Sequence, residues 1–257
     1  MTQHSPTTAR AFVAALELPA ASRSRAVARA APVAVSFDPA KDQALVVGSE
    51  VVSFVKGVAD ETRQDIVNGA LLAQLAANKK VSDCSDIVAW YDAYFDVLAH
   101  IGWVIQDRAL QAYEEEADGL TAHEAILKVA AVLLGPSPAA LAVVTSTVEA
   151  MRSLDADNPW ITIFNREAQS ANCARFQFVL AETDAQGRIV VSIMAFGLRA
   201  DASLTQVLFF KIRKNKVGLK QCAGKATINE TVLAGVREAI RTKLAGRIAD
   251  YVDSLDI

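Results

Sequence analysis

Three apolar segments in the second half of the chain constrain its fold most strongly. Residues 175–180, 189–196 and 206–213 place apolar and aromatic side chains at the two-residue spacing of β-strands. Residues 183–187 form a turn between the first two, and its glycine can adopt the positive φ that a short hairpin loop needs. Apolar residues on both faces of the third segment require cover on both sides. The region from Trp160 to Asn229 is therefore predicted to form consecutive antiparallel strands.

The segments on either side of this region have the apolar spacing of amphipathic helices. They cover residues 60–78, 86–101, 121–134 and 137–152, and a final helix begins at Thr231. The third and fourth are separated by a Gly-Pro-Ser-Pro break, which predicts an αα-hairpin suited to lying across one sheet face. These helices are the covers that the sheet requires.

The N-terminal third is less regular. Residues 32–37 form a candidate strand that ends before Asp38-Pro39. Residues 43–58 fit either a strand or a helix, because Gly48 and Gly57 interrupt a Val-rich run.

No internal repeat or low-complexity linker divides the chain. We therefore predict a single α/β (α+β) domain over residues 32–257, a three-layer sandwich with helices on both faces of a largely antiparallel sheet. Residues 1–31 hold four arginines against one acid and are rich in Ala and Ser. This composition is found in organelle transit segments, but more commonly in a flexible or loosely docked N-terminal segment.

The composition indicates a globular protein and argues against general nucleic-acid binding. Hydrophobic residues make up 52% of the chain, charged residues 21%, and the formal net charge is −3. Nucleic-acid binding needs a clustered basic surface, so we expect no nucleic-acid partner. No apolar run reaches the roughly 18–20 residues of a membrane-spanning helix, and no signal peptide is recognisable. We expect synthesis in soluble form, then a cytoplasmic location or release, followed by association with a membrane.

The three cysteines, Cys84, Cys173 and Cys222, are odd in number and widely spaced. They include no C-x-x-C pair, so neither a zinc site nor a disulfide framework is expected. We predict three separate reduced thiols in or near the core.

The motifs of common enzyme classes are incomplete. His123 opens a zinc-protease motif, but Leu127 stands where a second histidine is needed. The Gly-Lys pair at 224–225 suggests a phosphate loop, but Leu219 replaces its first glycine and Ala226 its magnesium-binding hydroxyl. We therefore predict that the protein is not an enzyme and has no catalytic residue, no metal and no cofactor other than a bound or covalent lipid.

A basic stretch is the strongest surface signal. From Ala202 to Asn229 the chain has no Asp or Glu, although it is acidic overall. The basic residues of this stretch are Lys211, Arg213, Lys214, Lys216, Lys220 and Lys225. At the tip of a hairpin, each would contribute about 1 kcal/mol to binding anionic lipid headgroups. We predict all six as headgroup contacts to an anionic phospholipid membrane. The alternative is that they protect an exposed strand edge from aggregation.

The order of residues in the central region is shared with a known family. Trp160-Ile161, Phe164 and Arg166-Glu167 precede the hairpin that opens at Phe176, and the later run Gln206-Val207-Leu208-Phe209-Phe210 follows Phe196, Leu198 and Arg199. This order and this run resemble those of the cytolytic δ-endotoxins, the Cyt toxins. The resemblance implies a bacterial α/β protein that binds phospholipid, rearranges, forms homo-oligomers and permeabilises membranes as a pore-forming or lytic toxin.

More loosely, the chain resembles a bacterial virulence factor of insect pathogens that carries a fatty acyl chain on a cysteine. By its position beside Lys220 and Gly224, Cys222 is the candidate acylation site, and a plain buried thiol is the commoner alternative. One acyl chain anchors a protein only marginally, so the basic stretch would supply a second signal. The alternative function is therefore a non-lytic interaction protein that carries a lipid or acyl group.

Overall fold

The structure is a computed structural model in which residues 5–20, 35–106, 111–112, 120–135, 137–154, 158–170, 172–200, 211–212 and 217–255 are described. The strands are β1 (Gln43–Val47), β2 (Glu50–Phe54), β3 (Trp103–Ile105), β4 (Gln111–Ala112), β5 (Leu120–Thr121), β6 (Gln169–Ser170), β7 (Cys173–Thr183), β8 (Ile189–Ala200), β9 (Lys211–Ile212), β10 (Val217–Ile228) and β11 (Val252–Leu255). The helices are α1 (Pro6–Ala15), α2 (Asp60–Lys80), α3 (Ile87–His100), α4 (Ala122–Leu134), α5 (Pro138–Ser153), α6 (Pro159–Ala168), α7 (Glu230–Leu244) and α8 (Ile248–Tyr251).

The main sheet has the strand order β11-β1-β2-β7-β8-β10-β3, with β4 paired to β10 and β6 to β7. Strands β7 and β8 form a long hairpin, in register from Cys173↔Arg199 to Thr183↔Ile189. Gly187 in the connecting turn has φ 77°, as the sequence requires. All pairs in this sheet are antiparallel except β2 with β7, so the prediction of a largely antiparallel sheet is confirmed.

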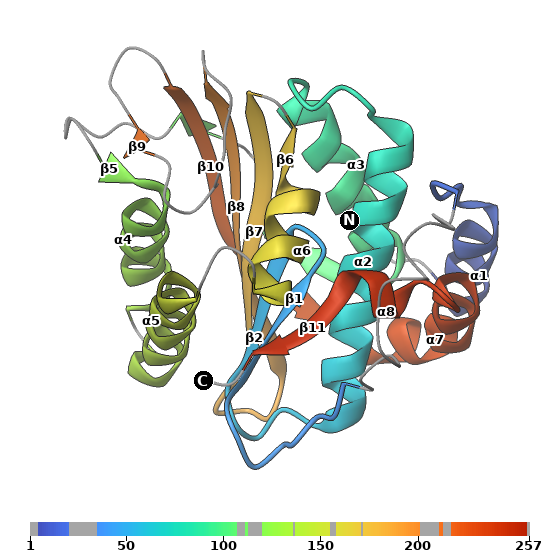
Figure 1. The fold of residues 1–257 in the computed structure, drawn as a ribbon. Helices are drawn as coiled ribbons and strands as arrows, with labels where there is room; N and C mark the ends of the chain where they lie inside the picture. Colours follow the sequence, from blue (N-terminus) through green and yellow to red (C-terminus); the bar gives the residue numbers. More distant parts are fainter. Residues whose placement is uncertain are drawn as a thin grey trace.

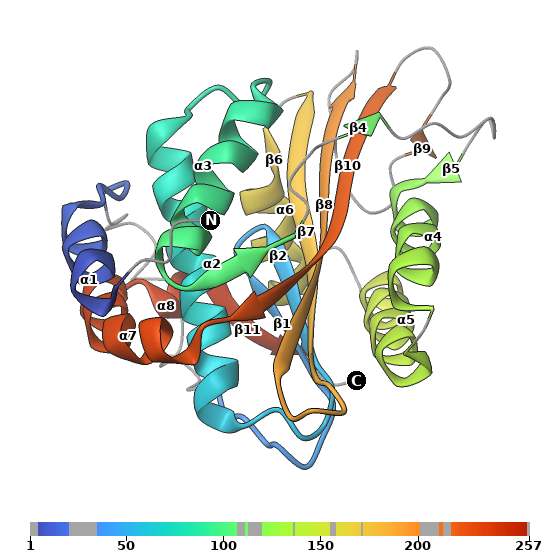
Figure 2. The same cartoon turned by 180° about the vertical axis from the view of Figure 1, so that it is seen from behind.

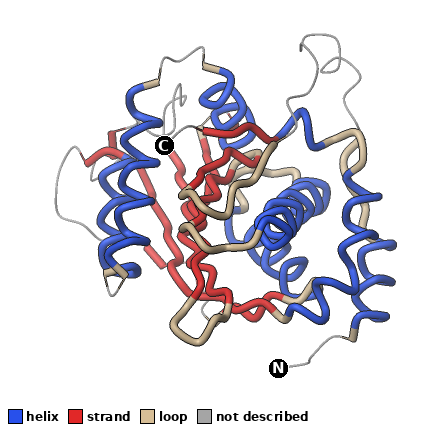
Figure 3. Tube along the Cα trace, turned by 90° about the horizontal axis from the view of Figure 1, so that it is seen from below, coloured by secondary structure: helices blue, strands red, loops and turns tan. Residues whose placement is uncertain are grey.

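Helices cover the sheet on both faces (Figures 1 and 2). On one face α1, α2, α3 and α7 bury what we call the α2–α3 core, whose sheet residues include Leu45, Val52, Phe54, Val179, Ile193 and Cys222. On the other face α4, α5 and α6 bury the α4–α5 core, whose sheet residues include Val51, Phe176, Phe178, Leu180, Met194, Phe196 and Leu198. Figure 3 shows the strands between these two helical layers. The predicted α+β sandwich is confirmed.

Local signals explain where several helices begin and end. The Asp86 carboxylate accepts a hydrogen bond from the Ala89 amide and caps α3, and Gly102, with φ 106°, follows its end. Helix α4 begins with a complete capping box between Thr121 and Glu124. Pro138 occupies the first turn of α5, as the break between the two predicted helices indicates.

The sequence prediction is wrong for the start of the central region. Residues 159–168 form helix α6 instead of a strand, because the apolar residues recur at helical spacing and the Asn158 side chain accepts a hydrogen bond from the Trp160 amide. Residues 35–37 of the first candidate strand have no regular structure, and 32–34 lie outside the described residues. The third predicted strand also lies outside them, except Lys211–Ile212, which pairs with β5.

Two ambiguous segments have defined structures. Residues 43–54 form the β1–β2 hairpin, with Gly48 at φ 59° in its turn. In the predicted N-terminal segment, α1 is docked: Ala9 and Val13 are fully buried, and the Arg10 guanidinium donates to the carbonyl oxygen of Gly235 in α7.

The prediction of three separate thiols is wrong. Cys84, in the α2–α3 loop, forms a disulfide with Cys173 at the start of β7, with a Cα–Cα distance of 6.1 Å. The two residues are 89 positions apart and meet only because α2 and α3 pack on the sheet. Cys222 lies outside this bond and is buried.

The disulfide predicts a thiol count. Protein unfolded without reductant should react with one equivalent of a thiol reagent, and with three after reduction. The variant Cys173→Ser should lower the free energy of unfolding by about 2–5 kcal/mol, since it removes a constraint on the unfolded chain. Cys222→Ser is the control, and it should leave no reactive thiol in the unreduced, unfolded protein. Three equivalents from unreduced wild-type protein would contradict the assignment.

Candidate functional site

The structure describes two of the six predicted headgroup contacts with their side chains, Lys220 and Lys225. For Lys211 only the backbone is described, in β9. Arg213, Lys214 and Lys216 lie outside the described residues, so the predicted basic tip lies outside them as well.

Lys220 and Lys225 project from opposite faces of β10. Successive side chains of a strand alternate between faces. Cys222, two residues from Lys220, lies in the α2–α3 core, whereas Ala223, two residues from Lys225, packs against the α4–α5 core. These two lysines therefore do not form one surface. The Cys222 side chain is 4% exposed and opposite Ala195 of β8, so an acyl group on its sulfur would extend into the α2–α3 core.

The β7–β8–β10 part of the sheet is long, and its face toward α4 and α5 is mainly apolar, whereas its face toward α2 and α3 also holds Arg175 and Gln177. Strand β10 carries Lys220 and Lys225, one on each face. The three strands contain 11, 12 and 12 residues. On the α4–α5 side the buried side chains are large, and the rings of Phe176 and Phe196 stack with centroids 5.2 Å apart. On the α2–α3 side the same strands bury smaller residues such as Val179 and Ala195.

The α4–α5 hairpin is held to the sheet mainly by apolar contacts. Two hydrogen bonds between described side chains join them. The Ser53 and Thr147 hydroxyl oxygens lie 3.3 Å apart, and the Ser137 hydroxyl donates to the Glu182 carboxylate at 2.7 Å. In α4, Val132 is 86% exposed and lines a pocket together with Gln221 and Ala223 of β10. As far as the described side chains show, separating the hairpin from the sheet would therefore leave few buried polar groups unpaired.

The α2–α3 side contains a buried polar cluster that sequence analysis missed. Glu50 in β2 has no exposed surface, and its Oε2 accepts hydrogen bonds from the Tyr94 hydroxyl at 2.8 Å and the Gln74 amide at 3.1 Å. Burial raises the pKa of Glu50 to about 7, against the two hydrogen bonds, which lower it. A single acid next to a Val-rich run, Glu50-Val51-Val52, is the signal that marks it in the sequence.

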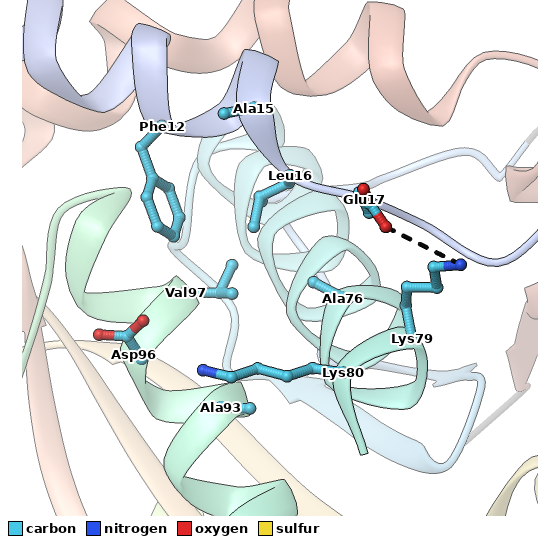
Figure 4. Close-up of a pocket in the computed structure, with 10 residues that line it drawn as sticks. All are labelled: Phe12, Ala15, Leu16, Glu17, Ala76, Lys79, Lys80, Ala93, Asp96 and Val97. Carbon is cyan, nitrogen blue, oxygen red and sulfur yellow. Dashed lines mark ion pairs between the residues drawn. The ribbon is translucent and has the colours of Figure 1, made fainter. Parts of the chain in front are cut away.

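A pocket of about 350 Å³ lies between α1, α2 and α3 (Figure 4). Its wall is apolar and is formed by Phe12, Ala15, Leu16, Ala76, Ala93 and Val97. Charged residues surround the opening. Lys79 Nζ lies 3.9 Å from Glu17 Oε2 in an ion pair, and Lys80 and Asp96 complete the rim. An apolar wall with a few charged groups at its mouth is typical of a small-molecule site.

The described part of the chain offers no site for a metal ion. Within it, His, Cys, Asp and Glu side chains form no group of three or more that could bind one. None of the helices in the described ranges combines the length and apolar character needed to cross a bilayer.

No protein-family model matches the chain, and no curated protein matches it in sequence. Solved structures that resemble it include a delta-endotoxin, with 16% identity and a TM-score of 0.41 over 79% of this chain and 89% of that one. The activated Cyt2Ba monomer from Bacillus thuringiensis subsp. israelensis aligns with 13% identity and a TM-score of 0.31, over 49% of this chain and 71% of that one. The Evf virulence factor aligns with 11% identity and a TM-score of 0.29, over 78% of this chain and 82% of that one.

These structures are of the two kinds that the sequence resembles, a δ-endotoxin and a virulence factor. At these identities and TM-scores the likeness is distant and concerns the path of the backbone alone. It assigns no activity, ligand or residue role to this chain.

Proposed function

We propose that this protein is a membrane-interacting toxin or virulence-type protein that acts on phospholipid bilayers by releasing a helical layer from its sheet. The observation that carries the proposal is the set of neighbouring strands β7, β8 and β10, with 11, 12 and 12 residues, whose face toward α4 and α5 buries Phe176, Phe178, Met194, Phe196 and Leu219. A strand needs about 9–11 residues to cross the hydrocarbon core of a bilayer.

The α4–α5 hairpin is the layer that moves in this proposal. Its release exposes the largest apolar side chains of the sheet, among them Phe176, Phe178 and Phe196. Unpaired strand edges are excluded from lipid because each unpaired backbone group costs several kcal/mol. Insertion therefore requires assembly with other copies of the chain, which makes the active form a homo-oligomer.

Anionic phospholipid is the proposed partner, and no catalytic step is involved. The six predicted headgroup contacts remain part of the proposal, and Lys220 and Lys225 would meet headgroups separately, because they lie on opposite faces of β10. Binding would weaken as salt concentration rises.

A disulfide staple between sheet and hairpin tests this function. The hydroxyl oxygens of Ser53 and Thr147 are 3.3 Å apart, so Ser53→Cys with Thr147→Cys should place two sulfurs within bonding reach. Wild-type protein should release dye from anionic liposomes. The oxidised double variant should release at least tenfold less, and reduction should restore its activity.

The matched controls are the two single variants and wild-type protein in the same reductant, which also opens Cys84–Cys173. Equal release by oxidised and reduced double variant would exclude movement of the α4–α5 hairpin. No release by wild-type protein at any pH or salt concentration would reject lytic activity altogether.

The pocket between α1, α2 and α3 favours a second function, that of a non-lytic lipid carrier. We propose that the acyl chain of a lipid lies in this pocket against the apolar wall, and that the anionic headgroup of the lipid contacts Lys80 at the rim. A carrier holds its ligand without any release of the sheet, so it would retain lipid under conditions that cause no leakage.

Filling the pocket tests the carrier. Ala15 is an exposed residue of α1 that lines the pocket, so Ala15→Trp should reduce the lipid extracted from purified protein at least tenfold. Ala14→Trp is the matched control, since Ala14 is also exposed but does not line the pocket. Intact mass separates covalent attachment at Cys222 from reversible binding. An equal lipid content in both variants would place the lipid elsewhere.

A further inference from the structure

The buried carboxyl group of Glu50 lies where the β1–β2 hairpin meets three other elements of the fold, α2, α3 and β7. It belongs to the β1–β2 hairpin, it accepts hydrogen bonds from Gln74 of α2 and Tyr94 of α3, and it lies beside Gln177 of β7 in the parallel register. The Gln74 amide also donates to the Val47 carbonyl at 2.9 Å, and its oxygen accepts from the Ser49 amide at 2.9 Å. The end of the hairpin is thus attached to both helices through one polar cluster.

Among the residues that the structure describes, the cluster contains no cation that could balance a charge on Glu50. The titratable groups that face it come from α3, where Tyr91 and Tyr94 are both buried, and burial raises the pKa of each hydroxyl. The group from α2 is the neutral Gln74. On β7, Arg175 contacts the Trp90 ring, with its guanidinium carbon 4.9 Å from the centroid. Among the described residues, no ion pair reaches Glu50, and its Oε1 is buried without a hydrogen-bond partner.

An ionised carboxylate in this position would lack both solvent and a counter-charge, which is strongly unfavourable. If α2 and α3 loosened from the hairpin, water could reach the Glu50 carboxylate and solvate its charge. Protonation removes the charge and leaves the acceptor bonds from Tyr94 and Gln74 in place.

We propose that Glu50 is a proton-controlled latch, which holds the α2–α3 layer against the β1–β2 hairpin when neutral and loosens it when ionised. The proposal goes beyond the membrane function, because it concerns the layer opposite the α4–α5 hairpin and needs no lipid.

The direction of the pH dependence follows from linkage. The pKa of Glu50 is raised from 4.5 to about 7 in the folded protein. Between these values the unfolded chain loses the proton while the folded chain keeps it, so stability falls as pH rises and the loss is complete above pH 7. A difference of this size corresponds to an increase of roughly 300-fold in the unfolding equilibrium constant.

Urea unfolding of wild-type protein and of Glu50→Gln between pH 4.5 and 8.5 tests the latch. The wild-type unfolding constant should rise with pH by up to roughly 300-fold, and the neutral variant should lack that rise. Glu124→Gln is the control: Glu124 is exposed and its hydrogen bonds to Thr121 lower its pKa, so it titrates at more acidic pH. Parallel curves for wild type and Glu50→Gln would overturn the proposal.

Two measurements locate the effect. At pH 8, hydrogen exchange in α2 and α3 should be faster in wild type than in Glu50→Gln, and at pH 5 the two should agree.

The variant Tyr94→Phe removes a hydrogen-bond donor that favours the carboxylate, so it should move the unfolding transition to higher pH. If Glu50→Gln does not fold, this shift and the infrared band of a protonated carboxyl in wild type near pH 6 decide the matter. An unmoved transition, or the absence of that band, would exclude the latch.

Discussion

The pairing of β7 with β8 is the interaction on which the rest of the structure depends. Its register places Phe176 opposite Phe196 and Phe178 opposite Met194 on one face, and Val179 opposite Ile193 on the other. Neither face can be left in water, because each would expose a large continuous apolar area. Two helical layers are the necessary result, and they bury two separate cores.

The two layers differ in chemistry. The α4–α5 layer meets the sheet through apolar side chains with few directional contacts, such as Ser137 to Glu182. The α2–α3 layer is tied by the Cys84–Cys173 disulfide and by the buried polar cluster around Glu50. An apolar contact can slide or separate at a cost that grows with area, whereas the hydrogen bonds of a buried polar cluster form only in one geometry. The molecule therefore has one helical layer held mainly by non-directional apolar contacts, and one held also by a disulfide and by hydrogen bonds of fixed geometry.

Sequence patterns were sufficient for the elements that depend on local chemistry. The capping box at Thr121, the turn at Gly187 and the apolar stripe of α3 each lie within a few residues, and each predicted its element correctly. Residues 159–168 form a helix although the sequence predicts strand there, because a short run of apolar and aromatic residues fits both the two-residue spacing of a strand and the 3.6-residue spacing of a helix. The sandwich with helices on both sheet faces was also predicted correctly, although the segment that suggested it, residues 206–213, lies outside the described residues except for Lys211–Ile212.

The candidate site was harder to predict because its parts are far apart in the chain. Cys84 and Cys173 are 89 residues apart, and the pocket combines α1 with α2 and α3. Glu50 is an ordinary acid in the sequence, and its pKa is raised only by burial among residues of α2, α3 and β7. For the predicted basic stretch the difficulty was different. Its residues are close in sequence, but Lys220 and Lys225 lie on opposite faces of β10, because side chains alternate between the faces of a strand.

The parallel contact between β2 and β7 has a consequence for the order in which the chain folds. All other pairs in the main sheet are antiparallel, and β7 and β8 are joined by a short turn, whereas β2 and β7 are separated in sequence by α2, α3, α4, α5 and α6. Contacts of long sequence separation form slowly because a large loop must close first. We therefore expect the β7–β8 hairpin to assemble early as a local nucleus and the N-terminal hairpin to join its edge later.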